Sequence, residues 1–208
     1  MNLPHPIDHS DQPIRLFQSD FLEFFTHISP LVVLIIWLPV GLFFLLRGLM
    51  ASPGLHNLFG VLLGLFLWTL TEYLMHRFVF HFPPRNARQE RIIFLFHGVH
   101  HRQPQCKTRL VMPPVVSIPL ALLYYALLSV VLNVLQQPLW LNPLLAGLIF
   151  GYLIYDMTHY ATHHFPMRRG VLKFLKRYHL QHHYKTPEQR FGVSSPLWDW
   201  VFHTMPND

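Results

Sequence analysis

The longest charge-free stretch of the chain constrains its fold more than any other feature. No Asp, Glu, Lys or Arg occurs between Leu110 and Tyr155, a run of 46 residues. As one straight helix at about 1.5 Å per residue it would be roughly 69 Å long, whereas the hydrocarbon core of a bilayer is only about 30 Å thick. The run must therefore fold back on itself, and we expect the turn at the QQP sequence, 136–138.

Two further apolar runs precede this one. Residues 28–46 contain no charged side chain, and the Leu- and Phe-rich run 55–71 ends at Glu72. Each is close to the roughly 20 residues that cross a bilayer as a helix. The chain is therefore predicted to be an all-α integral membrane protein. Its four transmembrane helices are expected near 30–48, 55–74, 113–135 and 139–157.

The remainder of the chain is polar and is expected to belong to the same single domain, 1–208. An N-terminal segment, 1–29, precedes the spans and lacks the pattern of a cleaved signal peptide. Two histidine-rich segments, 76–109 and 159–208, follow the second and fourth spans, so both lie on the same side as the N-terminus. We expect them to form a helical cap on the bundle.

The basic residues indicate which side this is. Fifteen of the sixteen Lys and Arg residues lie on the predicted side of the N-terminus, and only Arg47 lies on the other. By the positive-inside rule, both termini and both histidine-rich segments are expected to be cytosolic, in a bacterial inner membrane or the endoplasmic reticulum. The formal net charge of +6 is therefore a topology signal, and no nucleic-acid partner is expected.

Ten of the sixteen histidines fall in four short clusters, HRFVFH, HGVHH, HYATHH and HLQHH. They are His76, His81, His97, His100, His101, His159, His163, His179, His182 and His183. In each HxxHH sequence the first and last histidines share one helical face, whereas the two adjacent histidines point about 100° apart. Adjacent rings can thus serve two different ions, so the pattern predicts a two-metal centre.

The other six histidines are not needed for this centre. Isolated histidines are usually ordinary core or surface residues, and that is what we expect of His5, His9, His27, His56 and His203. His164 adjoins a cluster but is surplus to it.

The ligand set narrows the choice of metal. Imidazole favours zinc, iron, copper or nickel over magnesium or calcium. Cys106 is the single cysteine, which excludes cysteine-based zinc and iron–sulfur sites, and no HExxH sequence is present. Five histidines for each of two ions exceed the four ligands of a structural zinc site. We therefore expect two iron ions in the working enzyme, with dioxygen as cosubstrate, although zinc can occupy such a site in a purified sample.

Four segments resemble the fatty acid 2-hydroxylase branch of the fatty acid hydroxylase/sterol desaturase superfamily. They are TEYLMHRFVFH, HGVHHRQPQCKTRLVMPP, GYLIYDMTHYATHH and LKRYHLQHHYKTPEQRFGVSSPLWDWVFHT, which extend over about residues 71–208. The histidine spacings resemble the superfamily, and RLVMPP, YDMTHY and FGVSSPLWDWVF resemble this branch. The resemblance implies that the ten clustered histidines hold a dimetal centre. It also implies oxygen-dependent hydroxylation at C-2 of a long acyl chain, either free or in a sphingolipid such as ceramide.

Two carboxylates precede the clusters at helical spacing. Glu72 lies four residues before His76 and is a candidate acceptor for the second ring N–H of that histidine. Asp156 lies three residues before His159 and is placed to do the same there. The candidates for such supporting roles are Glu72, Asp156, Tyr155 and His164.

The expected substrate is a membrane lipid. No haem, flavin or iron–sulfur motif is visible, so we expect an external electron donor, namely a reductase with a small carrier protein. A desaturase or a sterol-modifying oxidase of the same superfamily is the nearest alternative. A non-catalytic metal binder is a further alternative, but a transporter would place its ligands in mid-membrane and not at helix ends.

Overall fold

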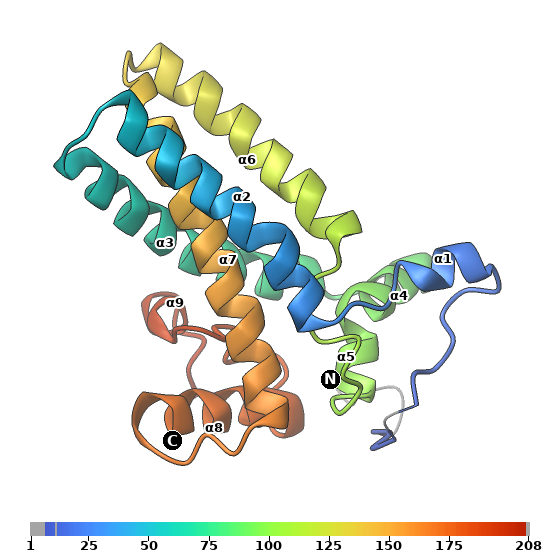
Figure 1. Ribbon diagram of the computed structural model, residues 1–208. Coiled ribbons are helices and arrows are strands. Elements are labelled where there is room, and N and C mark those ends of the chain that lie inside the picture. The colour runs from blue at the N-terminus through green and yellow to red at the C-terminus, as the bar shows by residue number, and fades with distance from the viewer. Residues whose placement is uncertain (1–6, 11, 207–208) are drawn as a thin grey trace. The chain divides into compact units, whose positions relative to one another are not determined.

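Figure 1 shows a computed structural model of the protein, which describes residues 7–10 and 12–206. All regular structure in these residues is helical. The long helices are α2 (Pro30–Ala51), α3 (Leu55–Met75), α6 (Pro114–Val134), α7 (Leu141–His164) and α8 (Gly170–Tyr184). The short α-helices are α1 (Asp20–Phe24), α4 (Ala87–Ile93), α5 (Val99–Arg102) and α9 (Leu197–Val201). Two π-helical turns, η1 (His76–Phe80) and η2 (Phe94–Gly98), and one 3-10 turn, η3 (Pro138–Trp140), complete the set.

Four helical segments are long and apolar enough to cross a membrane, in agreement with the prediction of four transmembrane helices. They are Pro30–Ala51, Leu55–Phe80, Pro114–Val134 and Pro138–His164. The second and fourth extend beyond the expected ends near 74 and 157, and they therefore carry three of the clustered histidines. We expected them to end soon after Glu72 and Asp156, but both carboxylates are buried and the helices continue past them.

Contacts within the chain group its residues into two compact units. The apolar unit consists of residues 30–68 and 112–154. The histidine unit consists of the described part of 1–29 together with 69–111 and 155–206. Helices α3 and α7 begin in the apolar unit and end in the histidine unit.

Small residues and buried hydrogen bonds hold the apolar unit together. Gly64 of α3 lies against Gly147 of α7 so closely that a Cβ atom at Gly64 would come within 2.3 Å of the Leu144 carbonyl oxygen. Such small residues let helix backbones approach in a membrane. The indole of Trp37 donates to Ser117 Oγ at 3.1 Å, which joins α2 to α6. Most other side chains of α2 and α6 face outwards, as expected of helices in lipid.

In the histidine unit, the N-terminal segment is fastened to the chain that follows α5. The buried amide of Gln103 accepts from the Ile14 N–H at 2.9 Å and donates to Asp8 at 2.7 Å. Further along, the Ile28 N–H donates to the Thr108 carbonyl at 2.9 Å. These contacts fix the C-terminal side of α5, a helix that carries two of the clustered histidines.

Candidate metal centre

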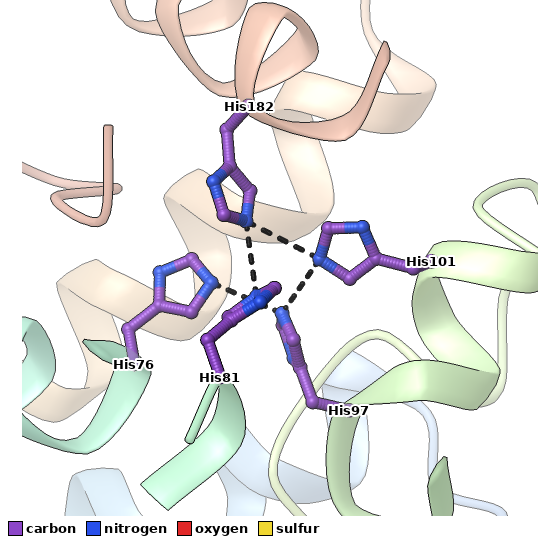
Figure 2. Close-up of side chains that lie close together, drawn as sticks. All are labelled: His76, His81, His97, His101 and His182. Atoms are coloured by element: carbon purple, nitrogen blue, oxygen red, sulfur yellow. Dashed lines mark hydrogen bonds between the residues drawn. The ribbon is translucent and has the colours of Figure 1, made fainter. Parts of the chain in front are cut away.

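The ten clustered histidines form two groups of five. The first histidine group, shown in Figure 2, is His76, His81, His97, His101 and His182. The second histidine group is His100, His159, His163, His179 and His183. Within each group, every residue contributes one ring nitrogen and these nitrogens lie within 4.8 Å of one another, so each group can hold a metal ion. These are the ten residues that the sequence indicated, and His164 belongs to neither group.

Helical geometry divides the histidines as the spacing predicted. On α5 and the turn before it, His97 and His101 belong to the first group, whereas His100 belongs to the second. On α8, His182 points to the first group while its neighbour His183 points to the second. Adjacent rings thus reach two different groups because they leave the helix about 100° apart.

A π-turn explains the one spacing that an α-helix does not accommodate. His76 and His81 are five residues apart, yet both belong to the first group. The turn η1 has the i→i+5 pattern, since the His81 N–H donates to the His76 carbonyl at 3.1 Å. This wider turn places residues five apart on one face, and π-bulges are frequent at functional sites. The five-residue spacing was the available sequence signal for it.

The protonation of two rings is fixed by the backbone. His76 Nδ1 donates to the Phe191 carbonyl at 2.5 Å, and His182 Nδ1 donates to the Gln189 carbonyl at 2.7 Å. Since a neutral imidazole carries one proton, Nε2 of each ring then presents a lone pair to the first group. His76 Nε2 lies 3.0 Å from His97 Nε2, and His182 Nε2 lies 3.2 Å from His101 Nε2. Converging lone pairs suit a cation, so these residues fit a metal ion.

Burial keeps the rings neutral. It lowers the pKa of His81 to about 2, with further lowering by the neighbouring His76. The same cause, followed by repulsion from neighbouring imidazoles, holds six other pKa values well below the usual range. These belong to His97, His100, His101, His179, His182 and His183. Neutral imidazole is the form that binds metals, so the site is prepared for metal binding without a competing proton.

Glu72 takes a different position from the one the sequence suggested. The His76 ring does not donate to it, because that ring's N–H is taken by the Phe191 carbonyl. Glu72 instead accepts from the backbone N–H groups of Val193 and Ser194, at 3.1 and 2.9 Å, and from Ser194 Oγ at 2.6 Å. The Glu72 carboxylate thus holds the loop that contains the Phe191 carbonyl. It acts on the His76 ring through this loop and not by direct contact.

The other three supporting candidates lie near the second histidine group. The Tyr155 ring stacks on His159, with ring centroids 5.9 Å apart. Asp156 is completely buried. His164 lies outside both groups with its ring against Tyr160, at a centroid distance of 4.6 Å.

Sequence reasoning missed Asp199, which holds the loop before it. This completely buried carboxylate accepts from the N–H groups of Phe191 and Gly192 at 2.8 and 2.7 Å. A single acidic residue between two tryptophans, in WDWVF, was the available signal. The carbonyl acceptors themselves carry no side-chain signature, so the sequence could not reveal them.

A cavity of about 900 Å³ opens beside the first histidine group. His81, His97 and His101 form part of its wall, and no described histidine of the second group lines it. Most of the remaining wall is apolar, including Phe80 and Phe94. Its charged lining residues are Arg77, Glu90, Arg91, Arg102 and Glu188. Such a cavity suits a long apolar molecule with a polar end.

Known proteins share this combination of sequence and fold. The chain matches the model of the fatty acid hydroxylase family over residues 61–204. It is 38% identical over 202 residues to dihydroceramide fatty acyl 2-hydroxylase FAH1 of Arabidopsis thaliana, which covers 97% of this chain and 83% of that protein. It is 40% identical over 189 residues to ceramide very long chain fatty acid hydroxylase SCS7 of Saccharomyces cerevisiae, which covers 89% of this chain and 48% of that protein.

A solved structure has a similar fold. The structure of full-length scs7p, in which only the hydroxylase domain is visible, matches with a TM-score of 0.84 at 38% sequence identity. The match covers 92% of this chain and 72% of that one.

Proposed function

The chain belongs to the fatty acid hydroxylase family, and we propose that it is a membrane-bound, oxygen-dependent hydroxylase that adds a hydroxyl group at C-2 of a long acyl chain. The acyl chain is a free fatty acid or part of a ceramide. One observation carries this proposal: two five-histidine groups adjoin each other through α5 and α8, and a large apolar cavity opens beside one of them. The relatives named as 2-hydroxylases support the position of attack.

The ten histidines of the two groups are the proposed metal ligands, and iron is the proposed metal. When bound, an iron pair supplies the redox chemistry that activates dioxygen, which zinc lacks. Zinc generally binds nitrogen ligands more tightly than ferrous iron, so zinc in a purified sample would not contradict this proposal. Asp156 and Tyr155 are proposed to support the second group from behind the rings.

The residues of the cavity would bind and orient the acyl chain. Phe80 and Phe94 supply apolar surface next to His97, which excludes water from the chain and from the open side of the first group. Arginine side chains such as Arg77 and Arg91 are the available partners for the oxygen atoms at the polar end of the lipid. Because C-2 is the carbon next to that end, binding the polar end here brings C-2 close to the first group.

The reaction requires electrons from outside the chain. Replacing a C–H bond by C–OH with dioxygen takes up one oxygen atom in the product and one in water, and it consumes two electrons and two protons. We propose that a reductase and a small carrier protein supply them. Purified protein with lipid and dioxygen alone should therefore be inactive until such a donor is added.

The orientation in the membrane follows from the basic residues. We propose that both termini and the histidine unit are cytosolic, in a bacterial inner membrane or the endoplasmic reticulum. Single cysteines introduced at residues 51–54 and 136–138 should be labelled by an impermeant reagent from the opposite side. Labelling of either turn from the cytosol would contradict this orientation.

Lipid mass spectrometry tests the proposed reaction directly. Expression in a host that lacks 2-hydroxylated lipids should produce 2-hydroxyacyl lipids, and the variant His97→Ala should not. Feeding acyl chains deuterated at C-2 should lead to loss of one deuterium. A product with a new double bond would assign the protein to the desaturases, and oxygen on a sterol or far along the chain would assign it to another branch.

A further inference from the structure

We infer that Asp199 is a positioning residue for the first histidine group, acting on the imidazole rings through two peptide groups. The inference rests on the proposed function, since it concerns how that metal centre is held. Asp199 is completely buried and belongs to the short helix α9, outside the ten-histidine set.

The first connection passes through the peptide that joins Phe191 to Gly192. Its N–H donates to Asp199 Oδ2 at 2.7 Å, and its carbonyl accepts from His76 Nδ1 at 2.5 Å. The N–H and C=O of a trans peptide point in opposite directions within one plane. A carboxylate on one side and an imidazole on the other therefore fix the orientation of this peptide, and the orientation of the His76 ring depends on it.

The second connection passes through the peptide that joins Gln189 to Arg190. Its carbonyl accepts from His182 Nδ1 at 2.7 Å, and its N–H donates to the Thr204 carbonyl at 3.1 Å. Asp199 holds Thr204 in turn, because its Oδ1 accepts from Thr204 Oγ1 at 2.7 Å and its carbonyl accepts from the Thr204 N–H at 2.8 Å. Both backbone carbonyls that fix rings of the first group thus depend on this one residue.

The negative charge of Asp199 adds to its geometric effect. A hydrogen bond to a carboxylate polarises the peptide, which makes its carbonyl a stronger acceptor for the next N–H in the chain. The carbonyl in turn makes the imidazole a better metal ligand, as acceptors behind metal-bound histidines generally do. Gly192 is required for this approach, because a Cβ atom there would lie 2.0 Å from the Ser195 carbonyl oxygen and 2.9 Å from Asp199 Oδ2.

This network reaches the first group only. The second group's rings at His100, His163, His179 and His183 have no protein hydrogen-bond partner at Nδ1 among the described residues, and in the first group this holds for His101. If Asp199 positions ligands, its loss should weaken one metal site and spare the other. A general contribution to folding would affect both sites alike.

The decisive variant is Asp199→Asn in the full-length protein, purified in detergent. The amide matches the carboxylate in size but replaces one acceptor oxygen by a donor, which would face a backbone N–H or the Thr204 hydroxyl. Titration with Co²⁺ against a chelator, followed by visible absorption, should show two sites in the wild type. In the variant, one site should bind Co²⁺ about 10–100-fold more weakly and show altered absorption bands, as expected when a hydrogen-bond partner behind a metal ligand is lost. The affinity and absorption of the other site should be unchanged.

Two further variants keep the test decisive if Asp199→Asn folds poorly. Thr204→Val removes the hydroxyl and should weaken the same site by a smaller factor, whereas Thr204→Ser keeps the hydroxyl and should restore binding. Glu23→Gln is the matched control, because Glu23 also accepts two backbone N–H groups, but these belong to Leu16 and Phe17 and not to residues 189–194. It should leave the ratio of the two affinities unchanged.

The remaining outcomes are distinct. Wild-type affinities at both sites in Asp199→Asn would overturn the inference, and so would equal weakening of both sites. A wild-type protein that binds fewer than two ions would instead contradict the proposed dimetal centre. The readout does not depend on activity, so an inactive preparation does not affect it.

Discussion

The two histidine groups have the same number of rings and similar burial, yet different structures support them. In the first group, backbone carbonyls of the loop 189–191 accept from His76 and His182. Ring contacts occur in both groups, such as Phe80 stacked on His97 in the first and Tyr155 stacked on His159 in the second. In the second group, however, four rings have no protein hydrogen-bond partner at Nδ1 among the described residues. The first group also adjoins the large cavity, whereas the second does not.

The difference teaches how a group of histidines can be held in place while one of its sides opens to a cavity. A ring enclosed by packed neighbours on all sides has few alternative rotamers, so close packing alone can keep it in place. In the first group, His81, His97 and His101 line the cavity, whereas the backbone hydrogen bonds fix the two rings that do not line it, His76 and His182. The open side is also where a substrate would bind, so the first group is held through the two rings that the loop can reach.

Removing one histidine ligand should have the largest effect, and the choice of histidine should determine which group loses its metal. His100→Ala and His101→Ala alter adjacent residues of α5, and each should reduce hydroxylation by more than about 100-fold, exceeding the loss caused by removing an outer partner. Their metal content should differ in kind: His101→Ala should empty the first group and His100→Ala the second. The cobalt absorption bands that are lost in one variant should therefore be the bands that remain in the other.

The pair His182→Ala and His183→Ala on α8 repeats this experiment independently. His182→Ala should resemble His101→Ala, and His183→Ala should resemble His100→Ala. His56→Ala is the control, because His56 lies outside both groups and in the apolar unit. Identical spectra for all four variants would mean that the two groups form one undivided site. Of the other isolated histidines, His5 lies outside the described residues.

Filling the cavity should affect catalysis without affecting metal binding. Ala87 begins α4 and lines the cavity, so Ala87→Trp would occupy part of the space proposed for the acyl chain. We expect about a 10-fold decrease in kcat/KM for long acyl chains, equivalent to about 1.4 kcal/mol, and a smaller decrease for short ones. Both metal ions should remain bound. Val171→Trp, at an exposed position of α8 away from the cavity, is the matched control. An unchanged profile of chain lengths would exclude the cavity as the acyl site.

The sequence predicted most of this arrangement for clear physical reasons. Charge-free length determines the number of spans, and 3.6-residue periodicity assigns His97 and His101 to one group and His100 to the other. The supporting contacts were less accessible. Glu72 holds backbone groups of residues far away in the chain, and Asp199 holds a nearby loop whose carbonyls accept from rings far away in the chain. Any residue type can supply a carbonyl. Spacing reveals which side chains share a helical face, but it does not reveal which loop passes behind them.

Substitution of Glu72 should weaken metal binding by a smaller factor than substitution of Asp199, and again only at the first group. Glu72→Gln leaves one acceptor oxygen but brings an NH₂ group against the donors of Val193 and Ser194. Leaving a buried hydrogen-bond donor without its partner costs about 1–3 kcal/mol, so thermal unfolding should shift downwards. Metal affinity of the first group should fall by less than in Asp199→Asn, because Glu72 holds residues 193–194 and not the two peptides that accept from the rings. A fall confined to the second group would contradict the division between the groups.

The smallest effect concerns the N-terminal segment, which should influence both groups equally because α5 supplies rings to both. Burial raises the pKa of Glu23. Hydrogen bonds from the N–H groups of Phe17 and Leu16, followed by His27 and Arg109, lower it by a larger amount, so the net shift of the pKa is downwards. A carboxylate with a lowered pKa stabilises the folded state above its unfolded pKa of about 4.5 and loses that contribution as the pH falls through its folded pKa. The segment should therefore open in acid.

Amide exchange at Leu16 and Phe17, corrected for intrinsic rates, should show opening below about pH 4.5 in the wild type, and opening at every pH in Glu23→Gln. At neutral pH, Glu23→Gln should change the two metal affinities by the same small factor. A change at one group alone would show that the segment supports that group specifically, and the contrast between the groups would then extend beyond the 189–194 loop.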